Sequence, residues 1–379
     1  MSQVVEKIAA EIGVAGSIPF RRFMELALYC PVYGYYEAEE DTIGRRGDYY
    51  TSVSVGPLFG ELLAGQFAEW LEQVQVTGGE GREGAPGRSK ASTSDNSLRL
   101  VEAGAHRGEL ARDILSWMRE NRPEISKRLQ YVIIEPSERR QSWQKRTLIE
   151  FSDKVQWMES LARFTKRLRG IVFSNELIDA FPVHRLGWDA SHRCWFEWGV
   201  TIERGLFTWA KLPIDGAGLS FTCPLSPVTE VLPDGFTVEV CPAAENWWRQ
   251  AARLLARGKL LTFDYGLTTE EFLGPKRKAG TLRAYHRHQL VSDVLANPGE
   301  QDITSQVNFT ALQEAGETAG LKTEALLSQS QFLTGVAARI WKGELAFGEW
   351  TAARTRQFQT LTHPEHLGRA FRALVQARA

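Results

Sequence analysis

The sequence is poor in cysteine, nearly neutral in charge and free of long apolar runs. Its four cysteines among 379 residues form no CxxC pair, which argues against a disulfide framework or a zinc site and favours a reducing compartment. The formal net charge of −1 argues against a general electrostatic footprint for nucleic acid or anionic membranes. No apolar run approaches the roughly 20 residues that span a bilayer, and the first residues match neither a signal peptide nor a transit peptide. We therefore predict a cytoplasmic protein with no membrane insertion, no nucleic-acid partner and no metal site.

Residues 98–115 carry the strongest local pattern. An apolar run from Leu98 ends at Glu102, breaks at Gly104 and Gly108, and then resumes with helical spacing. Strand, tight turn and helix in this order are typical of the opening of a Rossmann-like unit that holds a nucleotide-type cofactor. Taken alone this signal is weak, because glycine pairs between a strand and a helix are common.

An α/β rhythm continues after this turn. Further strands are expected near residues 129–134, 155–157, 170–174, 259–263 and 321–327, with helices near residues 161–168, 243–256 and 310–320. The expected organisation is an N-terminal helical cap with a cofactor-side loop (1–75), a flexible low-complexity loop (76–97), the first part of a Rossmann-like core (98–182), a β-rich insertion (183–242), the second part of the core (243–345) and a helical segment (346–379).

Polar side chains follow the expected strands at their carboxyl ends, where open parallel sheets bind ligands. Glu135, at the end of the second strand, is placed to accept the hydroxyl groups of a ribose, or else it caps the helix that follows. Asn175, Glu176 and Asp179 follow another strand and include two carboxylates three residues apart. Such a pair could orient a guanidinium group, which carries five donors in a fixed fork. Alternatively, Asn175 and Asp179 satisfy the backbone around the turn at residues 181–182.

Several stretches taken together resemble one known family. They are Phe23-Met-Glu-Leu-Ala-Leu-Tyr29 with Pro31-x-Tyr-Gly-Tyr-Tyr36, Gly44-x-x-Gly-Asp48 with Phe59-Gly-Glu61, Glu102-x-Gly-x-x-x-Gly108, Asn175-Glu-x-x-Asp-Ala-x-Pro182, Asp264-Tyr-Gly266, Gly280-Thr-Leu-Arg-Ala-Tyr285 and Asp302-Ile-Thr304. In this order, the set is similar to the family of the mitochondrial complex I assembly methyltransferase, also called the mitochondrial dysfunction protein A family.

This resemblance implies a class I fold dependent on S-adenosylmethionine (SAM) and, in the mitochondrial member, methylation of an arginine on a complex I subunit. It implies that Gly104 and Gly108 face the methionine part of SAM and that Glu135 faces its ribose. The full set of implied cofactor-binding residues is Gly47, Asp48, Thr51, Glu102, Gly104, Gly108 and Glu135. The residues implied to border the methyl-acceptor site, and hence to be catalytic, are Asn175, Glu176 and Asp179. The implied partner is a protein substrate, with a respiratory-complex subunit as one candidate.

The sequence departs from the family pattern at a few positions. His106 stands in the glycine turn where the family usually has a glycine, and Gln306 and Asn308 stand where His and Asp are common. Two alternatives to the methyltransferase stay open. One is a SAM-binding assembly or interaction factor without turnover, for which tryptophans of the β-rich insertion would supply a docking surface. The other is a nicotinamide dehydrogenase, which would explain Gly104 and Glu135 but not the turn at residues 175–182.

Overall fold

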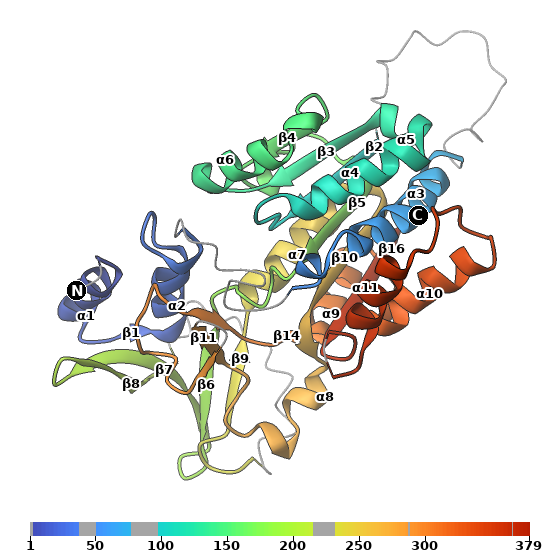
Figure 1. Ribbon diagram of the computed structural model, residues 1–379. Helices are drawn as coiled ribbons and strands as arrows, with labels where there is room; N and C mark the ends of the chain where they lie inside the picture. The colour runs from blue at the N-terminus through green and yellow to red at the C-terminus, as the bar shows by residue number, and fades with distance from the viewer. Residues whose placement is uncertain (1–2, 38–50, 77–97, 215–231, 287–288, 366) are drawn as a thin grey trace, which may run out of the picture. The chain divides into compact units, whose positions relative to one another are not determined.

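The computed structural model describes residues 3–37, 51–76, 98–214, 232–286, 289–365 and 367–379 (Figure 1). The chain divides into two compact units, each built from three segments. The accessory unit contains residues 1–50, 178–246 and 266–312, and the Rossmann unit contains residues 51–177, 247–265 and 313–379.

The Rossmann unit is organised around a twisted sheet. From one edge to the other its strands are β15 (Lys322–Ser328), β16 (Phe371–Arg378), β10 (Leu255–Leu267), β5 (Leu168–Asn175), β2 (Leu98–Ala103), β3 (Leu129–Ile134) and β4 (Val155–Met158). All neighbours from β10 to β4 are parallel, and β16 is antiparallel to both β10 and β15. The strand order reverses between β2 and β5, which makes the carboxyl ends of these two strands the expected place for a ligand.

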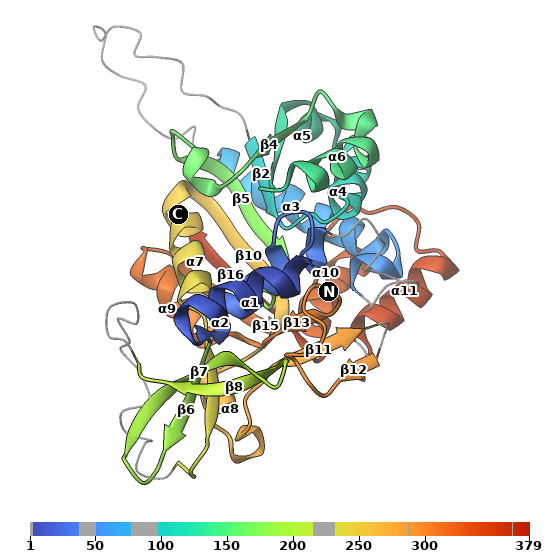
Figure 2. The same ribbon diagram turned by 90° about the vertical axis from the view of Figure 1, so that its left-hand side faces the viewer.

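Helices cover both faces of this sheet (Figure 2). One apolar core joins one face of the strands to α3 (Leu58–Val76), α4 (Glu109–Asn121), α10 (Gln329–Trp341) and α11 (Ala352–Thr362). The opposite face is covered by α7 (Pro242–Leu254) and α9 (Phe309–Thr318). Trp248 of α7 donates to the side chain of Gln376 in β16, which in turn donates to the Gln313 carbonyl of α9. The central strands β2, β3 and β5 are buried on both faces and are therefore largely apolar without alternation, as parallel strands usually are. Two short helices, α5 (Pro123–Arg128) and α6 (Glu138–Thr147), flank β3 in the sequence.

The accessory unit is built on a second, antiparallel sheet. Its order is β1 (Ile18–Pro19), β7 (Cys194–Glu203), β6 (His184–Asp189) and β9 (Thr237–Val240), and β8 (Leu206–Leu212) pairs with β7. Helices α1 (Gln3–Ala15) and α2 (Phe20–Tyr29) bury Ile8, Phe20 and Phe23 in one core with Val200 of β7. The remaining elements are α8 (Thr269–Phe272), β11 (Arg283–His286), β12 (Gln289–Val291), β13 (Asp302–Thr304) and β14 (Val307–Asn308).

The α/β class, the Rossmann-like sheet, the N-terminal helices and the strands of the 183–242 insertion are confirmed. The helix expected at residues 161–168 is wrong, because the structure has only a 3-10 turn at Leu161–Arg163 before β5 begins. The helical segment expected at residues 346–379 is correct for α11 and wrong for β16. In β16 a composition rich in Ala, Arg and Gln is overridden by pairing with a strand on each side.

The two units also divide the chain at other points than expected. Helix α3, placed by the sequence in the N-terminal cap, belongs to the Rossmann unit because Phe59, Leu63 and Phe67 pack into the sheet core. Residues 266–312, expected in the second part of the core, belong to the accessory unit. Among the described residues, no helix is both long and apolar enough to cross a membrane.

Candidate functional site

The turn after β2 has a left-handed backbone conformation that residues other than glycine adopt with difficulty. Gly104, His106 and Gly108 have φ values of +78°, +44° and +83°, in the left-handed region that glycine enters at least cost. A Cβ at Gly104 would lie 2.8 Å from the Leu177 side chain, and a Cβ at Gly108 would lie 3.1 Å from the Leu148 side chain. Both glycines are therefore required by conformation and by close packing, while His106 holds a strained position of the kind found at functional sites.

Glu102 lies in the sheet core just before this turn. Its side chain is 2% exposed, and its Oε2 accepts a hydrogen bond of 2.7 Å from the hydroxyl of the fully buried Tyr131. Burial raises the pKa of Glu102 to about 7, against a smaller lowering by the Tyr131 hydrogen bond. Its carboxyl group is thus a buried, easily protonated group on the face that α3 and α4 cover. A direct contact between Glu102 and a cofactor stays a prediction.

Replacement of Glu102 by glutamine should change how stability depends on pH. Below pH about 4.5 the carboxyl group is neutral in both the folded and the unfolded chain, so it does not lower the free energy of unfolding. Between that pH and about 7 only the unfolded chain ionises, so stability falls as pH rises, by about 3 kcal/mol for a pKa difference of this size. Urea unfolding at several pH values should show this loss in the wild type and a smaller loss in Glu102→Gln, whose amide oxygen still accepts from Tyr131. Parallel stability curves for the two proteins would contradict the assignment.

Glu135, at the end of β3, is buried and already hydrogen-bonded. Its Oε1 accepts from the Ser137 backbone N–H (3.0 Å) and from Arg140 Nε (2.9 Å), and its Oε2 accepts from Gln144 Nε2 (3.1 Å). Glu135 thus contacts the N-cap residue of α6, while the cap itself is made by the Ser137 side chain. A carboxylate offers about four acceptor positions, and described residues occupy three of them. Within the described part of the chain, one position therefore stays available to a ligand hydroxyl, and a second requires Arg140 to release Oε1.

Asn175 and Glu176 lie together at the carboxyl end of β5. The Ser52 backbone N–H and Asn175 Nδ2 both donate to Glu176 Oε1, at 3.1 and 2.9 Å. Glu176 has φ +51°, and its backbone N–H donates to the Phe263 carbonyl. Asn175 is 9% exposed, and its buried Oδ1 has no hydrogen-bond partner among the described residues. At the switch point of the sheet, a fixed carboxylate on a strained backbone thus lies beside an acceptor that no described residue satisfies.

The loop before α3 supports this pair. Thr51 and Ser54 close a turn by exchanging hydrogen bonds between side chains and backbone N–H groups, at 3.0 and 3.1 Å. The Ser52 hydroxyl donates to Oε1 of the buried Gln329 (3.0 Å). The Thr51 hydroxyl is therefore used within the loop, and a role in cofactor binding stays a prediction for it. The predicted residues Gly47 and Asp48 lie outside the described residues.

Asp179 belongs to the accessory unit. It is 7% exposed, and its backbone carbonyl accepts from the Ser305 N–H (2.9 Å). Residues 176–179 form no helical turn, because a separate turn at residues 178–181 follows Leu177. The reason for expecting Glu176 and Asp179 to share one face is therefore wrong, and a catalytic role for Asp179 stays a prediction.

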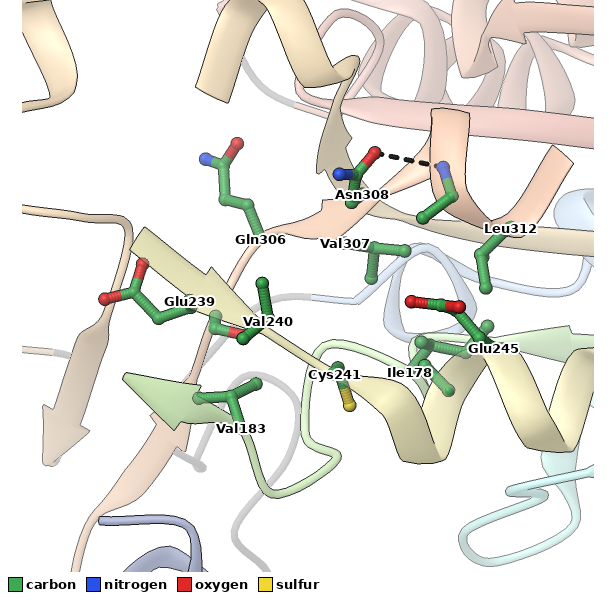
Figure 3. A pocket seen from close by; sticks show the side chains of 13 residues that line it. Ile178, Val183, Glu239, Val240, Cys241, Glu245, Gln306, Val307, Asn308 and Leu312 are labelled. Atoms are coloured by element: carbon green, nitrogen blue, oxygen red, sulfur yellow. Dashed lines mark hydrogen bonds between the residues drawn. The ribbon is translucent and has the colours of Figure 1, made fainter. Parts of the chain in front are cut away.

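A small pocket lies within the accessory unit (Figure 3). It has a volume of about 50 Å³ and combines apolar walls such as Ile178 and Val307 with the polar side chains of Glu245, Gln306 and Asn308. Asn308 Oδ1 accepts from the Ala311 N–H (3.1 Å), so this residue caps α9. An aspartate could make the same cap, which explains how the departure from the family pattern at this position preserves the local fold.

Sequence reasoning missed one buried ionic group in this unit, Glu239 of β9. Its Oε2 accepts from the backbone N–H and the hydroxyl of Thr281, at 2.6 and 2.9 Å, and its Oε1 lies 3.6 Å from Arg185 Nε. A Cβ at Gly280 would lie 2.3 Å from Glu239 Oε1. The Gly280-Thr281 motif therefore accommodates this carboxylate, and the only signal in the sequence was an acid between two valines of a β-like run.

The strand order, the strained glycine turn and the polar groups at the switch point together define a cofactor-binding α/β enzyme. A sequence profile of the family described as "Putative S-adenosyl-L-methionine-dependent methyltransferase" matches residues 62–327. The chain belongs to this family of SAM-dependent methyltransferases.

Individual relatives agree with this assignment. The protein named "Protein arginine methyltransferase NDUFAF7 homolog, mitochondrial" from Drosophila melanogaster is 28% identical over 84% of this chain and 70% of its own length. The protein named "Protein arginine methyltransferase NDUFAF7, mitochondrial" from Danio rerio is 26% identical over 97% of this chain and 85% of its own. A crystal structure of a "likely methyl transferase" from Burkholderia thailandensis, bound to S-adenosyl-homocysteine, has a TM-score of 0.80 and 28% identity. It covers 99% of this chain and 92% of that one.

The predictions of a class I SAM methyltransferase fold, of methyltransferase activity and of SAM as the cofactor are confirmed. The nicotinamide dehydrogenase alternative is wrong. The prediction of a cytoplasmic protein is also wrong by this comparison, because the similar relatives are named as mitochondrial proteins. Few cysteines and a net charge near zero fit any reducing compartment, so composition could not make that distinction.

Proposed function

We propose that this enzyme transfers the methyl group of SAM to an arginine side chain of a protein. The observation that carries the proposal is the arrangement at the end of β5. There the carboxylate of Glu176 is fixed beside Asn175 Oδ1, which has no hydrogen-bond partner among the residues that the structure describes. The names of the relatives from Drosophila melanogaster and Danio rerio, both protein arginine methyltransferases, support the same substrate class.

The residues around the glycine turn fit SAM. The turn from Gly104 to Gly108 leads into α4, whose first N–H groups favour a negative group such as the carboxylate of a methionine moiety. Glu135 keeps an acceptor position for a ribose hydroxyl, and Asn175 Oδ1 would accept a hydrogen from an amino or guanidinium group. When bound, SAM supplies a methyl group activated by its sulfonium.

The acceptor side must hold a cation and take up a proton. An arginine guanidinium has a pKa above about 12, so its nitrogen sheds a proton as it becomes methylated. In this proposal the fixed carboxylate of Glu176 orients the guanidinium through charge-assisted hydrogen bonds and accepts that proton. Positioning of the two reactants would supply much of the acceleration.

We propose a protein as the methyl acceptor, with a respiratory-complex subunit as the first candidate to test. The purified enzyme should label a protein in extract of its host when it is supplied with SAM carrying a radioactive methyl group. Acid hydrolysis of the labelled band should release methylated arginine. Label on lysine, or label on small molecules only, would contradict the proposed substrate class. SAM binding without any transfer would favour an interaction factor instead.

A further inference from the structure

The glutamine at position 144 connects the two halves of the candidate cofactor site. Gln144 lies in α6 and is fully buried. Its Nε2 donates to the His106 carbonyl in the glycine turn (3.0 Å) and to Glu135 Oε2 at the end of β3 (3.1 Å). Its Oε1 accepts from Trp157 Nε1 of β4 (2.9 Å). We infer that Gln144 is a positioning residue for SAM, which holds the glycine turn and Glu135 at a fixed separation; this rests on the proposed role of Glu135.

These three partners determine the orientation of the amide. An amide nitrogen has two hydrogens and no acceptor, and an amide oxygen accepts only. In the flipped orientation the oxygen would face the His106 carbonyl and the Glu135 carboxylate, and the nitrogen would face the Trp157 N–H. All three contacts would then be repulsive, so a single orientation satisfies the site and the amide has no freedom to turn.

The packing around Gln144 makes this connection rigid. A Cβ at Gly108 would lie 3.5 Å from the Gln144 Cα and 3.1 Å from the Leu148 side chain, so α6 runs directly against the turn. His106, with φ +44°, is the strained residue of the turn, and its carbonyl is the one that Gln144 holds. A side chain that can only donate at this point therefore fixes both the strained backbone and the carboxylate.

Gln376 offers a closely matched control elsewhere in the Rossmann unit. It is also fully buried, its Oε1 accepts from Trp248 Nε1 (2.8 Å), and its Nε2 donates to the Gln313 carbonyl (2.9 Å) and to Thr323 Oγ1 (2.8 Å). The two glutamines thus have the same burial and the same types of partner, except that only Gln144 donates to a carboxylate at the cofactor site.

The test compares Gln144→Glu with Gln376→Glu in the full-length protein, with affinity for S-adenosylhomocysteine measured by calorimetry near pH 8 and near pH 6. A carboxylate at position 144 still accepts from Trp157 but repels Glu135. We expect Gln144→Glu to bind at least about tenfold more weakly than the wild type near pH 8, as for loss of a charged hydrogen bond. Near pH 6 the added carboxyl group can carry a proton and donate again, so binding should partly return. Gln376→Glu should bind like the wild type at both pH values.

Several charged or titratable groups surround Gln144 and could also respond to the change in pH. Glu135 accepts from Gln144 and pairs with Arg140, the His106 ring and Arg107 belong to the turn, and Lys145 lies over the Trp157 ring. The wild type contains all of these groups, so its own change in affinity between the two pH values is subtracted. Gln144→Met, which is uncharged and of similar length, should bind weakly at both pH values and serves if Gln144→Glu does not fold.

The possible results separate this inference from the proposal on which it rests. If Glu135→Ala loses affinity while Gln144→Glu and Gln144→Met both bind like the wild type, the positioning role of Gln144 is overturned. If Glu135→Ala itself binds like the wild type, the proposed role of Glu135 fails first. Equal losses of affinity in Gln144→Glu and Gln376→Glu, without recovery near pH 6, would indicate general damage to the core and would also overturn the inference.

Discussion

Replacement of Glu135 by alanine should weaken the binding of S-adenosylhomocysteine by at least about tenfold, and by up to about 10⁴-fold if two ribose hydroxyls donate to this carboxylate. A hydrogen bond to a charged group contributes about 1.5–3 kcal/mol, which corresponds to one to two orders of magnitude in affinity for each hydroxyl. Calorimetric titration of the full-length protein measures the effect directly.

The structure supplies two controls for this experiment, because Glu135 also accepts from the backbone N–H of Ser137, the N-cap residue of α6, and pairs with Arg140. Ser137→Ala removes the side-chain cap of α6, which accepts from the Arg140 backbone N–H at 3.3 Å, and leaves Glu135 in place. It should lower stability by about 1 kcal/mol without a comparable change in affinity. Arg140→Gln frees Oε1 of Glu135 and should preserve or tighten binding. If Glu135→Ala binds as tightly as Ser137→Ala, the carboxylate serves only the helix.

Replacement of Glu176 by glutamine should lower kcat by about 10²-fold or more while leaving the affinity for S-adenosylhomocysteine nearly unchanged. The glutamine Oε1 can still accept from the Ser52 N–H and from Asn175 Nδ2, so the local geometry is preserved. The variant loses the negative charge that orients a guanidinium and accepts its proton, and positioned acid–base groups typically contribute about 10²- to 10⁴-fold. The measurement is the rate of methyl incorporation into a labelled protein band at saturating SAM.

Ser52→Ala is the matched variant for this residue. It removes the bond from the Ser52 hydroxyl to Gln329 but keeps the backbone N–H that contacts Glu176. Its kcat should stay close to that of the wild type even if the protein becomes slightly less stable. Equal activity of Glu176→Gln and the wild type would remove Glu176 from the reaction and would direct attention to Asp179 in the accessory unit.

Much of the fold could be predicted because it is encoded locally. The apolar run at residues 129–134 matches β3, and the glycines at positions 104 and 108 mark a turn that requires positive φ. Strand β16 could not be identified in this way, because its sequence also suits a helix and only pairing with β10 and β15 decides its conformation.

Only part of the candidate site could be predicted from the sequence. Acids and amides at strand ends can be found from the sequence, since parallel strands bring their carboxyl ends to one edge of a sheet. The role of Gln144 could not be found in this way. A single glutamine inside a polar helix gives no periodic signal, and its three partners lie on separate segments of the chain. The contact between Ser52 and Glu176 likewise joins residues 124 apart in the sequence.

The position of β16 has a consequence for how the protein is made. This strand lies between β10 and β15 yet follows both of them in the chain. Until the ribosome has released residues 371–378, β10 and β15 each present an unpaired edge, the kind of surface that recruits other chains. A nascent or truncated polypeptide without this segment therefore exposes two unpaired strand edges in the middle of its sheet. We expect chaperones to bind such a chain and proteases to degrade it.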